Sequence, residues 1–126
     1  MNQLEQLLTQ QVEGEVRFDD YSRALYSTDA SLYQINPVGV VIPRTKADVQ
    51  RTVQICYEND VPILPRGGGT SLAGQTVGRA VIIDFSKYMN QIIEVNVAER
   101  WARVEPGIVL DELNSQLKPY GLMYAP

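Results

Sequence analysis

The segment from Val61 to Gln75 has the sequence VPILPRGGGTSLAGQ, in which an apolar run, a proline and an arginine precede three consecutive glycines and two hydroxyl side chains. This order predicts a strand that opens into a loop. The glycines are Gly67, Gly68, Gly69 and Gly74. Ordering four glycines costs about 2–4 kcal/mol relative to alanine, so a plain connection would avoid them. A ligand that needs close access to backbone N–H groups would offset this cost, because successive amides in a turn form a nest that suits phosphate. We therefore expect an anion-binding loop.

Composition limits the kind of protein this chain can be. It has 126 residues, of which 44% are hydrophobic, and a formal net charge of −4. This size and composition suit one domain with its own core. The acidic balance argues against nucleic acid as a partner. No apolar run approaches the roughly 20 residues of a membrane span, and Met1–Glu5 lacks the layout of a signal peptide. We expect a cytoplasmic location, with membrane association only through parts outside this chain.

Cys56 is the single cysteine, and the chain has no histidine. One cysteine cannot form an internal disulfide or ligate a cluster, and histidine is the commonest acid–base group and metal ligand. We therefore expect no metal site. No cationic residue flanks Cys56, so we expect a small core residue rather than a nucleophile.

The spacing of apolar residues predicts the regular elements. Helices are expected over residues 2–13, from Thr45 to Asn59, and from Val109 to near Pro119, and strands over residues 38–43, from Val61, and over 80–85, 91–96 and 101–105. Residues 15–36 form an irregular or short-helical lead-in, and residues 96–100 a hairpin connection. In the second helix, Thr45 and Asp48 have the spacing of a capping box. Its apolar face is predicted at Val49, Val53 and Cys56. Together these elements predict an α+β domain.

Three kinds of glycine loop fit the spacing in part. Residues 69–76, GTSLAGQT, keep the glycines and hydroxyl of a Walker A loop, but they place Gln75 where that motif needs lysine, and an apolar strand follows instead of a helix. A Rossmann fingerprint needs a glycine three residues after Gly69, and it also needs a helix. The third alternative is a glycine turn without a ligand, although three adjacent glycines exceed what a turn requires.

Segments beyond the loop carry a family resemblance. Residues 61–71 followed by Gly74 resemble the pyrophosphate-binding loop of FAD-linked oxidases of the vanillyl-alcohol oxidase/PCMH type, whose relatives include D-lactate and glycolate dehydrogenases. Residues 41–49, 84–92 and 104–108 resemble, in turn, the first strand and helix start of that family, its following strands, and the turn into its next helix. Residues 25–31, LYSTDAS, look closest to large bacterial FAD-linked oxidoreductases with a carboxy-terminal iron–sulfur half.

The resemblance implies an FAD pyrophosphate site in the loop. Backbone N–H groups of residues 66–71 would bind the pyrophosphate, supported by the Thr70 and Ser71 hydroxyls. Hydrogen bonds to a charged acceptor contribute roughly 1.5–3 kcal/mol each, so a few of them offset the cost of the glycines. Arg66 either pairs with phosphate or braces the loop against a carboxylate such as Asp84, and Gln75 reaches the ribityl chain or the flavin edge. The expected cofactor-binding residues are Pro65, Arg66, Gly67, Gly68, Gly69, Thr70, Ser71, Gly74 and Gln75. Since no histidine is present, the flavin should be held non-covalently.

The resemblance also implies what lies outside this chain. The fold class is α+β: the first half of a PCMH-type FAD-binding domain, with a short mixed sheet flanked by helices. Residues 1–34 would form an N-terminal helix and lead-in, and residues 35–126 the first part of the domain, truncated at its C-terminus. The catalytic base, the substrate-binding residues and any iron–sulfur cluster would lie in missing carboxy-terminal parts. We therefore expect no catalytic residue here and no activity from this chain alone.

Two functions fit these expectations. In the first, the chain is the FAD-binding segment of a flavoprotein dehydrogenase that oxidises a small 2-hydroxy acid such as D-lactate or glycolate, with hydride passing from substrate to flavin. In the alternative, it is a non-catalytic module that binds FAD weakly or not at all. Such a module would self-associate into a homo-oligomer through a bare apolar surface, because large apolar patches rarely stay unpaired.

Overall fold

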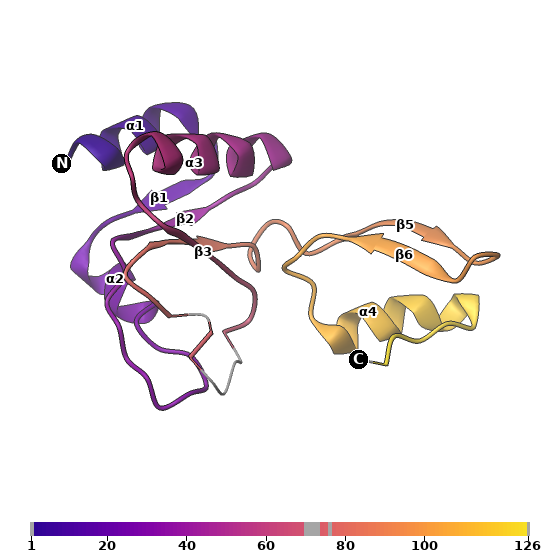
Figure 1. The fold of residues 1–126 in the computed structure, drawn as a ribbon. Coiled ribbons are helices and arrows are strands. Elements are labelled where there is room, and N and C mark those ends of the chain that lie inside the picture. The colour runs from indigo at the N-terminus through magenta and orange to yellow at the C-terminus, as the bar shows by residue number, and fades with distance from the viewer. Residues whose placement is uncertain (1, 70–73, 76, 126) are drawn as a thin grey trace.

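A computed structural model describes residues 2–69, 74–75 and 77–125 of this protein, and Figure 1 shows its ribbon. The elements in chain order are α1 (Gln3–Gln11), β1 (Glu15–Arg17), α2 (Asp20–Leu25), β2 (Gly39–Ile42), α3 (Lys46–Glu58), β3 (Ile63–Arg66), β4 (Val81–Asp84), β5 (Ile92–Asn96), β6 (Trp101–Val104), α4 (Leu110–Leu117) and the 3-10 helix η1 (Lys118–Tyr120). This combination of helices and sheet confirms the α+β class.

The larger sheet has the strand order β1-β2-β4-β3. Strand β4 runs parallel to both of its neighbours, β2 and β3, whereas β1 is antiparallel to β2. Every residue of β2 and β4 is buried, as expected for central strands covered on both faces. The predicted short mixed sheet is therefore confirmed.

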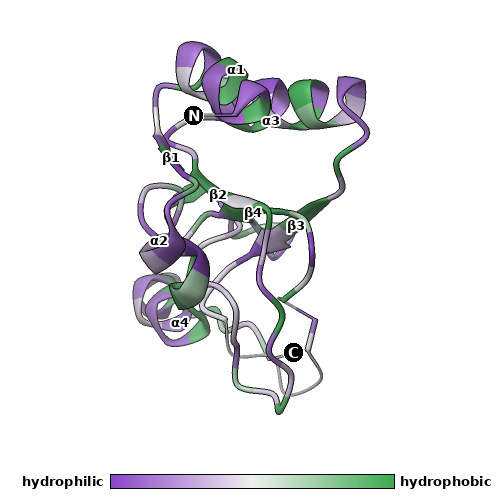
Figure 2. Cartoon of the chain, turned by 90° about the vertical axis from the view of Figure 1, so that its left-hand side faces the viewer, coloured by the Kyte–Doolittle hydropathy of each residue, from purple (hydrophilic) through white to green (hydrophobic). Residues whose placement is uncertain are grey.

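Helices α1 and α3 lie side by side over one face of this sheet (Figures 1 and 2). The cluster on that face consists of Leu8, Val12, Val41, Ile55, Cys56 and Val81. The cluster on the opposite face consists of Val40, Ile42 and Ile82, with Tyr26, Leu64 and Tyr88 packed against it. Cys56 is fully buried, which confirms its place in the core. The sheet is thus the middle layer of the fold, and Tyr26 packs against its second face.

The start of α3 is held differently from the predicted capping box. Thr45 Oγ1 accepts from the N–H of Asp48 at 3.2 Å, which is one half of that motif. The Asp48 carboxylate accepts instead from the N–H groups of Glu13, Gly14 and Arg44 at 2.9–3.0 Å. The predicted second half of the capping box, in which the Asp48 carboxylate accepts a hydrogen bond from the start of its own helix, was wrong. The carboxylate is instead the acceptor for the turn between α1 and β1 and for Arg44. Asp48 therefore ties this turn to the start of α3.

The buried face of α3 is also displaced from the predicted one. Val53 is 40% exposed, whereas Thr52 and Ile55 are buried. A buried threonine is tolerated because its hydroxyl donates to the Asp48 carbonyl oxygen at 2.8 Å. The prediction of Val53 as a core residue was wrong, since buried Asp48 fixes which side of the helix faces the sheet.

After β4 the chain builds a second unit from β5, β6 and α4, which Figure 1 shows beside the larger sheet. Strands β5 and β6 pair antiparallel as a separate two-stranded sheet, as the hairpin prediction required. Gly107 joins the two units. A Cβ atom there would lie 2.2 Å from the Phe85 carbonyl oxygen, and the Gly107 N–H donates to the Met89 carbonyl oxygen at 2.9 Å. This close approach to the backbone of Phe85 and Met89 permits only glycine at this position.

Candidate functional site

The glycine loop leaves the sheet at the carboxyl end of β3. There Arg66 lies opposite Asp84 of the parallel neighbour β4, and the Phe85 N–H donates to the Arg66 carbonyl oxygen at 3.1 Å. The Gly69 carbonyl oxygen accepts from the Ala30 N–H at 3.1 Å, so the loop also contacts the lead-in after α2. Crevices at the carboxyl ends of parallel strands are where ligands bind in many α/β sheets. The predicted loop therefore occupies a favourable place for a binding site.

The structure describes most of the predicted site residues. Pro65 and Arg66 end strand β3, and Gly67, Gly68, Gly69, Gly74 and Gln75 are described in the segment after it. The predictions for Thr70 and Ser71 lie outside the described residues. Among the described residues, a Cβ atom at Gly67 would meet only the Pro106 carbonyl oxygen, at an ordinary 3.6 Å.

Two of these glycines are required by conformation and by space. Gly69 and Gly74 have φ values of 69° and 72°, in the left-handed region that favours glycine. A Cβ atom at Gly69 would lie 2.4 Å from Nη2 of Arg66, and one at Gly74 would lie 2.6 Å from the Tyr33 ring. At these two positions the backbone therefore lies directly against a side chain, which is Arg66 at Gly69 and Tyr33 at Gly74.

Arg66 reaches Asp84 through Tyr26. The Arg66 guanidinium lies over the Tyr26 ring, 5.1 Å from its centroid, and its Nη1 donates to the Tyr26 carbonyl oxygen at 3.4 Å. The Tyr26 hydroxyl donates to Oδ2 of Asp84, and Oδ1 of Asp84 accepts from the Ser86 N–H and hydroxyl at 2.8 and 2.7 Å. The sequence offered phosphate or Asp84 as the partner of Arg66. The structure adds the aromatic ring between this arginine and the carboxylate.

The environment of Tyr26 keeps its hydroxyl protonated. Burial raises the pKa of this phenol well above its usual range, and the hydrogen bond to Asp84 raises it further. Tyr26 is thus a permanent donor to Asp84, and its ring is a permanent neutral face beneath Arg66.

Sequence reasoning missed this part of the site. Tyr26 and Tyr33 belong to the lead-in, where the structure places strand β1, helix α2 and an isolated bridge between Thr28 and Gln34. No periodic pattern marks these contacts, because they join residues far apart in the sequence. The available signal was the presence of tyrosines in an otherwise polar segment that resembled the family.

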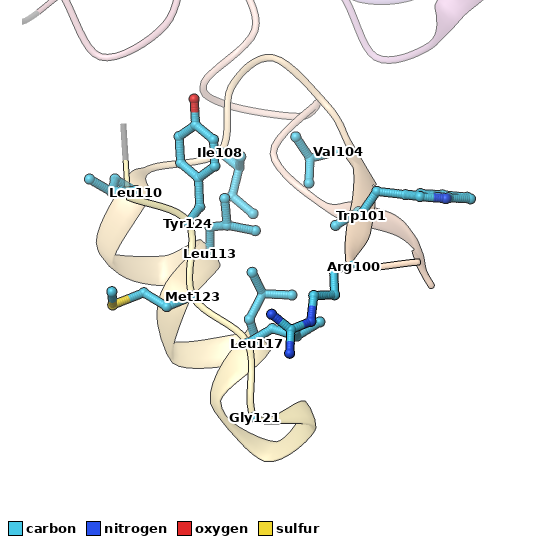
Figure 3. Close-up of a pocket in the computed structure, with 12 residues that line it drawn as sticks. Arg100, Trp101, Val104, Ile108, Leu110, Leu113, Leu117, Gly121, Met123 and Tyr124 are labelled. Carbon is cyan, nitrogen blue, oxygen red and sulfur yellow. The ribbon is translucent and has the colours of Figure 1, made fainter. Parts of the chain in front are cut away.

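A hollow lies in the unit formed by β6, α4 and the turn that follows α4 (Figure 3). Its volume is about 780 Å³, and it shares no residue with the glycine loop. It is lined by Arg100, Trp101, Ala102, Val104, Ile108, Leu110, Leu113, Leu117, Gly121, Leu122, Met123 and Tyr124. Figure 3 shows the side chains of Ile108 and Leu113 close together within it. The lining is mostly apolar, so the hollow suits other apolar side chains rather than an anion.

Among the described residues there is neither a membrane-spanning helix nor a cluster that could hold a metal ion. No helix among them is long and apolar enough to cross a bilayer. Within residues 2–69, 74–75 and 77–125, no group of three or more histidine, cysteine or acidic side chains could hold a metal ion.

Comparisons with known proteins show the family to which this chain is similar. The model of a family described as an FAD binding domain matches residues 37–126. The chain is 41% identical to D-2-hydroxyglutarate dehydrogenase of Escherichia coli (strain K12), a match that covers 100% of this chain and 13% of that enzyme. It is 40% identical to glycolate oxidase subunit GlcD of Bacillus subtilis (strain 168), covering 97% of this chain and 26% of that subunit.

A solved structure confirms the predicted fold family. The crystal structure of p-cresol methylhydroxylase with substrate bound has a TM-score of 0.74 and covers 96% of this chain and 25% of that one. Its sequence identity of 22% makes this a likeness of fold alone. The predicted PCMH-type architecture is thereby confirmed.

The described loop fits the cofactor that the family description names. It offers an arginine, bare backbone at Gly67 and left-handed turns at Gly69 and Gly74, all of which suit a pyrophosphate. The chain spans about an eighth of the length of the dehydrogenase and about a quarter of the subunit that it matches. From the match over residues 37–126 we conclude that this chain belongs to the FAD binding domain family.

Proposed function

We propose that the glycine loop binds the pyrophosphate of FAD without a covalent bond. The observation that carries the proposal is the Arg66 guanidinium, which lies against Gly69 at the carboxyl end of β3. The proposed binding residues are Pro65, Arg66, Gly67, Gly68, Gly69, Thr70, Ser71, Gly74 and Gln75. Backbone N–H groups and the arginine would hold the two phosphates, because both are donors that suit charged oxygens.

We further propose that the complete protein is an FAD-dependent dehydrogenase of a small 2-hydroxy acid. Its relatives include a D-2-hydroxyglutarate dehydrogenase and a glycolate oxidase subunit, and other matches are D-lactate dehydrogenases. Bound FAD supplies the acceptor for hydride. In this proposal the loop anchors and orients the cofactor, and residues 35–126 are the first part of the FAD domain. We assign no catalytic residue to this chain.

The proposal is tested by ligand competition on the complete flavoprotein, freed of FAD. Because the loop is proposed to recognise the pyrophosphate, ADP should compete with FAD and riboflavin should not. Gly68→Val should abolish flavin retention, whereas Gly78→Ala should retain it, since among the described residues a Cβ atom at Gly78 would meet only Leu64, at an ordinary 3.8 Å. A Gly68→Val protein that purifies with full flavin content would contradict the proposed site.

The 126-residue chain alone should bind FAD with a Kd weaker than about 1 μM.

The second candidate, a self-associating module, is favoured by one observation. The apolar hollow between β6 and α4 includes side chains such as Leu110, which is 40% exposed, and Met123, which is 73% exposed. A two-stranded sheet is marginally stable without further packing, so a second copy could cover this face.

Light scattering across a range of chain concentrations tests this candidate. Self-association through the hollow predicts a dimer that Leu110→Lys abolishes. Val53→Lys is the matched control, because Val53 is equally exposed but lies on α3. A monomer at all concentrations, or a dimer that survives Leu110→Lys, would remove this candidate.

A further inference from the structure

We propose that Tyr26 is a positioning residue of the FAD site: it sets the orientation of the Arg66 guanidinium within the glycine loop before the pyrophosphate arrives. This inference rests on the proposed function of the loop. It concerns a residue outside the loop sequence, which the glycine pattern does not indicate.

The first step is that Tyr26 is itself fixed. It caps the C-terminus of α2, and its ring packs against the buried cluster of Val40, Ile42 and Ile82. Its hydroxyl donates to the Asp84 carboxylate at the end of β4, and Asp84 is only 6% exposed. The ring is therefore held at one end by the core and at the other by a buried acceptor.

The second step is that Asp84 is committed to its neighbours. Its Oδ2 atom accepts from the Tyr26 hydroxyl, while its Oδ1 atom accepts twice from Ser86. The hydrogen bonds that both oxygens accept thus hold the Asp84 carboxylate in a defined orientation. Asp84 serves as the anchor of the tyrosine and sets the angle of its ring.

The third step is that this ring supports the arginine. Tyr26 presents its ring face to the guanidinium at 5.1 Å and its carbonyl oxygen to Nη1 at 3.4 Å. Guanidinium groups stack on aromatic faces, and a planar group held in this way has fewer orientations to lose when an anion binds. The guanidinium is held next to Gly69, whose missing side chain leaves it room. Asp84 therefore holds Tyr26, Tyr26 holds the Arg66 guanidinium, and this guanidinium lies against the loop at Gly69.

The experiment measures the FAD Kd of the complete flavoprotein, freed of FAD, for Tyr26 variants in two backgrounds. Tyr26→Phe keeps the ring but loses its bond to Asp84, so we expect about threefold weaker binding. Tyr26→Leu loses the ring face, so we expect about tenfold weaker binding. In an Arg66→Gln background both losses should shrink to within about twofold, because the tyrosine then has no guanidinium to orient. Tyr21→Leu is the control, because Tyr21 lies on helix α2, which Tyr26 caps, and is 74% exposed; this variant should bind FAD as the parent does.

The outcomes separate this inference from the proposed function. If Tyr26→Phe binds as tightly as the parent, or if it loses the same factor in both backgrounds, Tyr26 has no positioning role and the inference is overturned. This decision depends on Tyr26→Phe, which retains the packing of the ring and so stands even where Tyr26→Leu does not fold. If Gly68→Val leaves FAD binding unchanged, the loop assignment itself fails, whatever the tyrosine variants show.

Discussion

The guanidinium of Arg66 lies in the space that a side chain at Gly69 would need, since a Cβ atom there would be 2.4 Å from Nη2. The same glycine has a φ of 69°. The conformation of the loop and the position of its cation therefore depend on each other.

Gly69→Ala should destabilise the protein and weaken FAD binding. A left-handed alanine costs about 1–2 kcal/mol, and the contact with Arg66 adds to this loss. In the Gly69→Ala, Arg66→Ala double variant, the stability lost through the contact with Arg66 should be regained. The stability lost through the left-handed φ of residue 69 should not be regained. Urea unfolding measures the free energy of unfolding of the single and the double variant. Gly78→Ala is the control, and its free energy of unfolding should lie within about 0.5 kcal/mol of that of the parent. Equal stability of Gly69→Ala and Gly78→Ala would argue against the loop conformation.

Asp48→Ala should be among the most destabilising single changes in the chain. It removes the acceptor of three backbone N–H groups from a position that is 0% exposed. The three bonds are part-buried, and a buried donor left unsatisfied costs about 1–3 kcal/mol, so we expect a loss of about 2–3 kcal/mol in the free energy of unfolding. Asp20→Asn, at a fully exposed carboxylate, should change it by less than about 0.5 kcal/mol. Similar losses in the two variants would show that the Asp48 bonds do not hold the turn.

Stability should fall in acid in a manner that depends on Glu15. The hydrogen bonds that its carboxylate accepts from Lys87, Tyr88 and Arg17 lower its pKa from 4.5 to about 2. A carboxylate with a lowered folded-state pKa contributes fully above its unfolded value, and this contribution is lost as the pH falls from about 4.5 towards 2. Glu15→Gln should therefore remove part of the acid dependence between these values. Denaturant unfolding at pH 6 and pH 3 tests this, and identical pH profiles for the parent and Glu15→Gln would count against the prediction.

The Cys56 thiol should resist alkylation in the folded protein. It is fully buried, and desolvation raises its pKa to about 11, so little thiolate forms at neutral pH. Labelling with a thiol reagent should follow global unfolding, and the rate should rise with urea through the unfolding transition. Rapid labelling in the absence of denaturant would show that α3 separates from the sheet under native conditions.

Local patterns predicted most of the fold. Strands β2, β4, β5 and β6 and helices α1, α3 and α4 lie within a few residues of the expected ranges, because each has an apolar period or a clear stop. Strand β1 was missed because it has three residues, with Val16 as its only apolar one. Its pairing with β2 depends on a partner far along the chain, which a local pattern does not encode.

The glycine loop of the candidate site was predictable from the sequence, but the side chains that pack against it were not. Consecutive glycines and an adjacent arginine are visible in the sequence because the loop is local. The contacts of Arg66 with Tyr26, and of Gly74 with Tyr33, join residues about 40 positions apart. Val53 shows the same limit of local patterns. The helix around it was predicted correctly, but buried Asp48 decides which side of that helix faces the sheet, and Val53 is exposed.

The connection from Gly67 to Ala80 also has a topological role. Parallel neighbours cannot be joined by a tight hairpin and need a crossover of about a dozen or more residues. Here the crossover from β3 to β4 is the segment that contains the glycine loop, and β4 is the central strand that pairs with both β2 and β3. Deleting the loop would therefore unpair the middle of the sheet as well as remove a ligand site. In this architecture, point substitutions can separate binding from folding, whereas a loop deletion cannot.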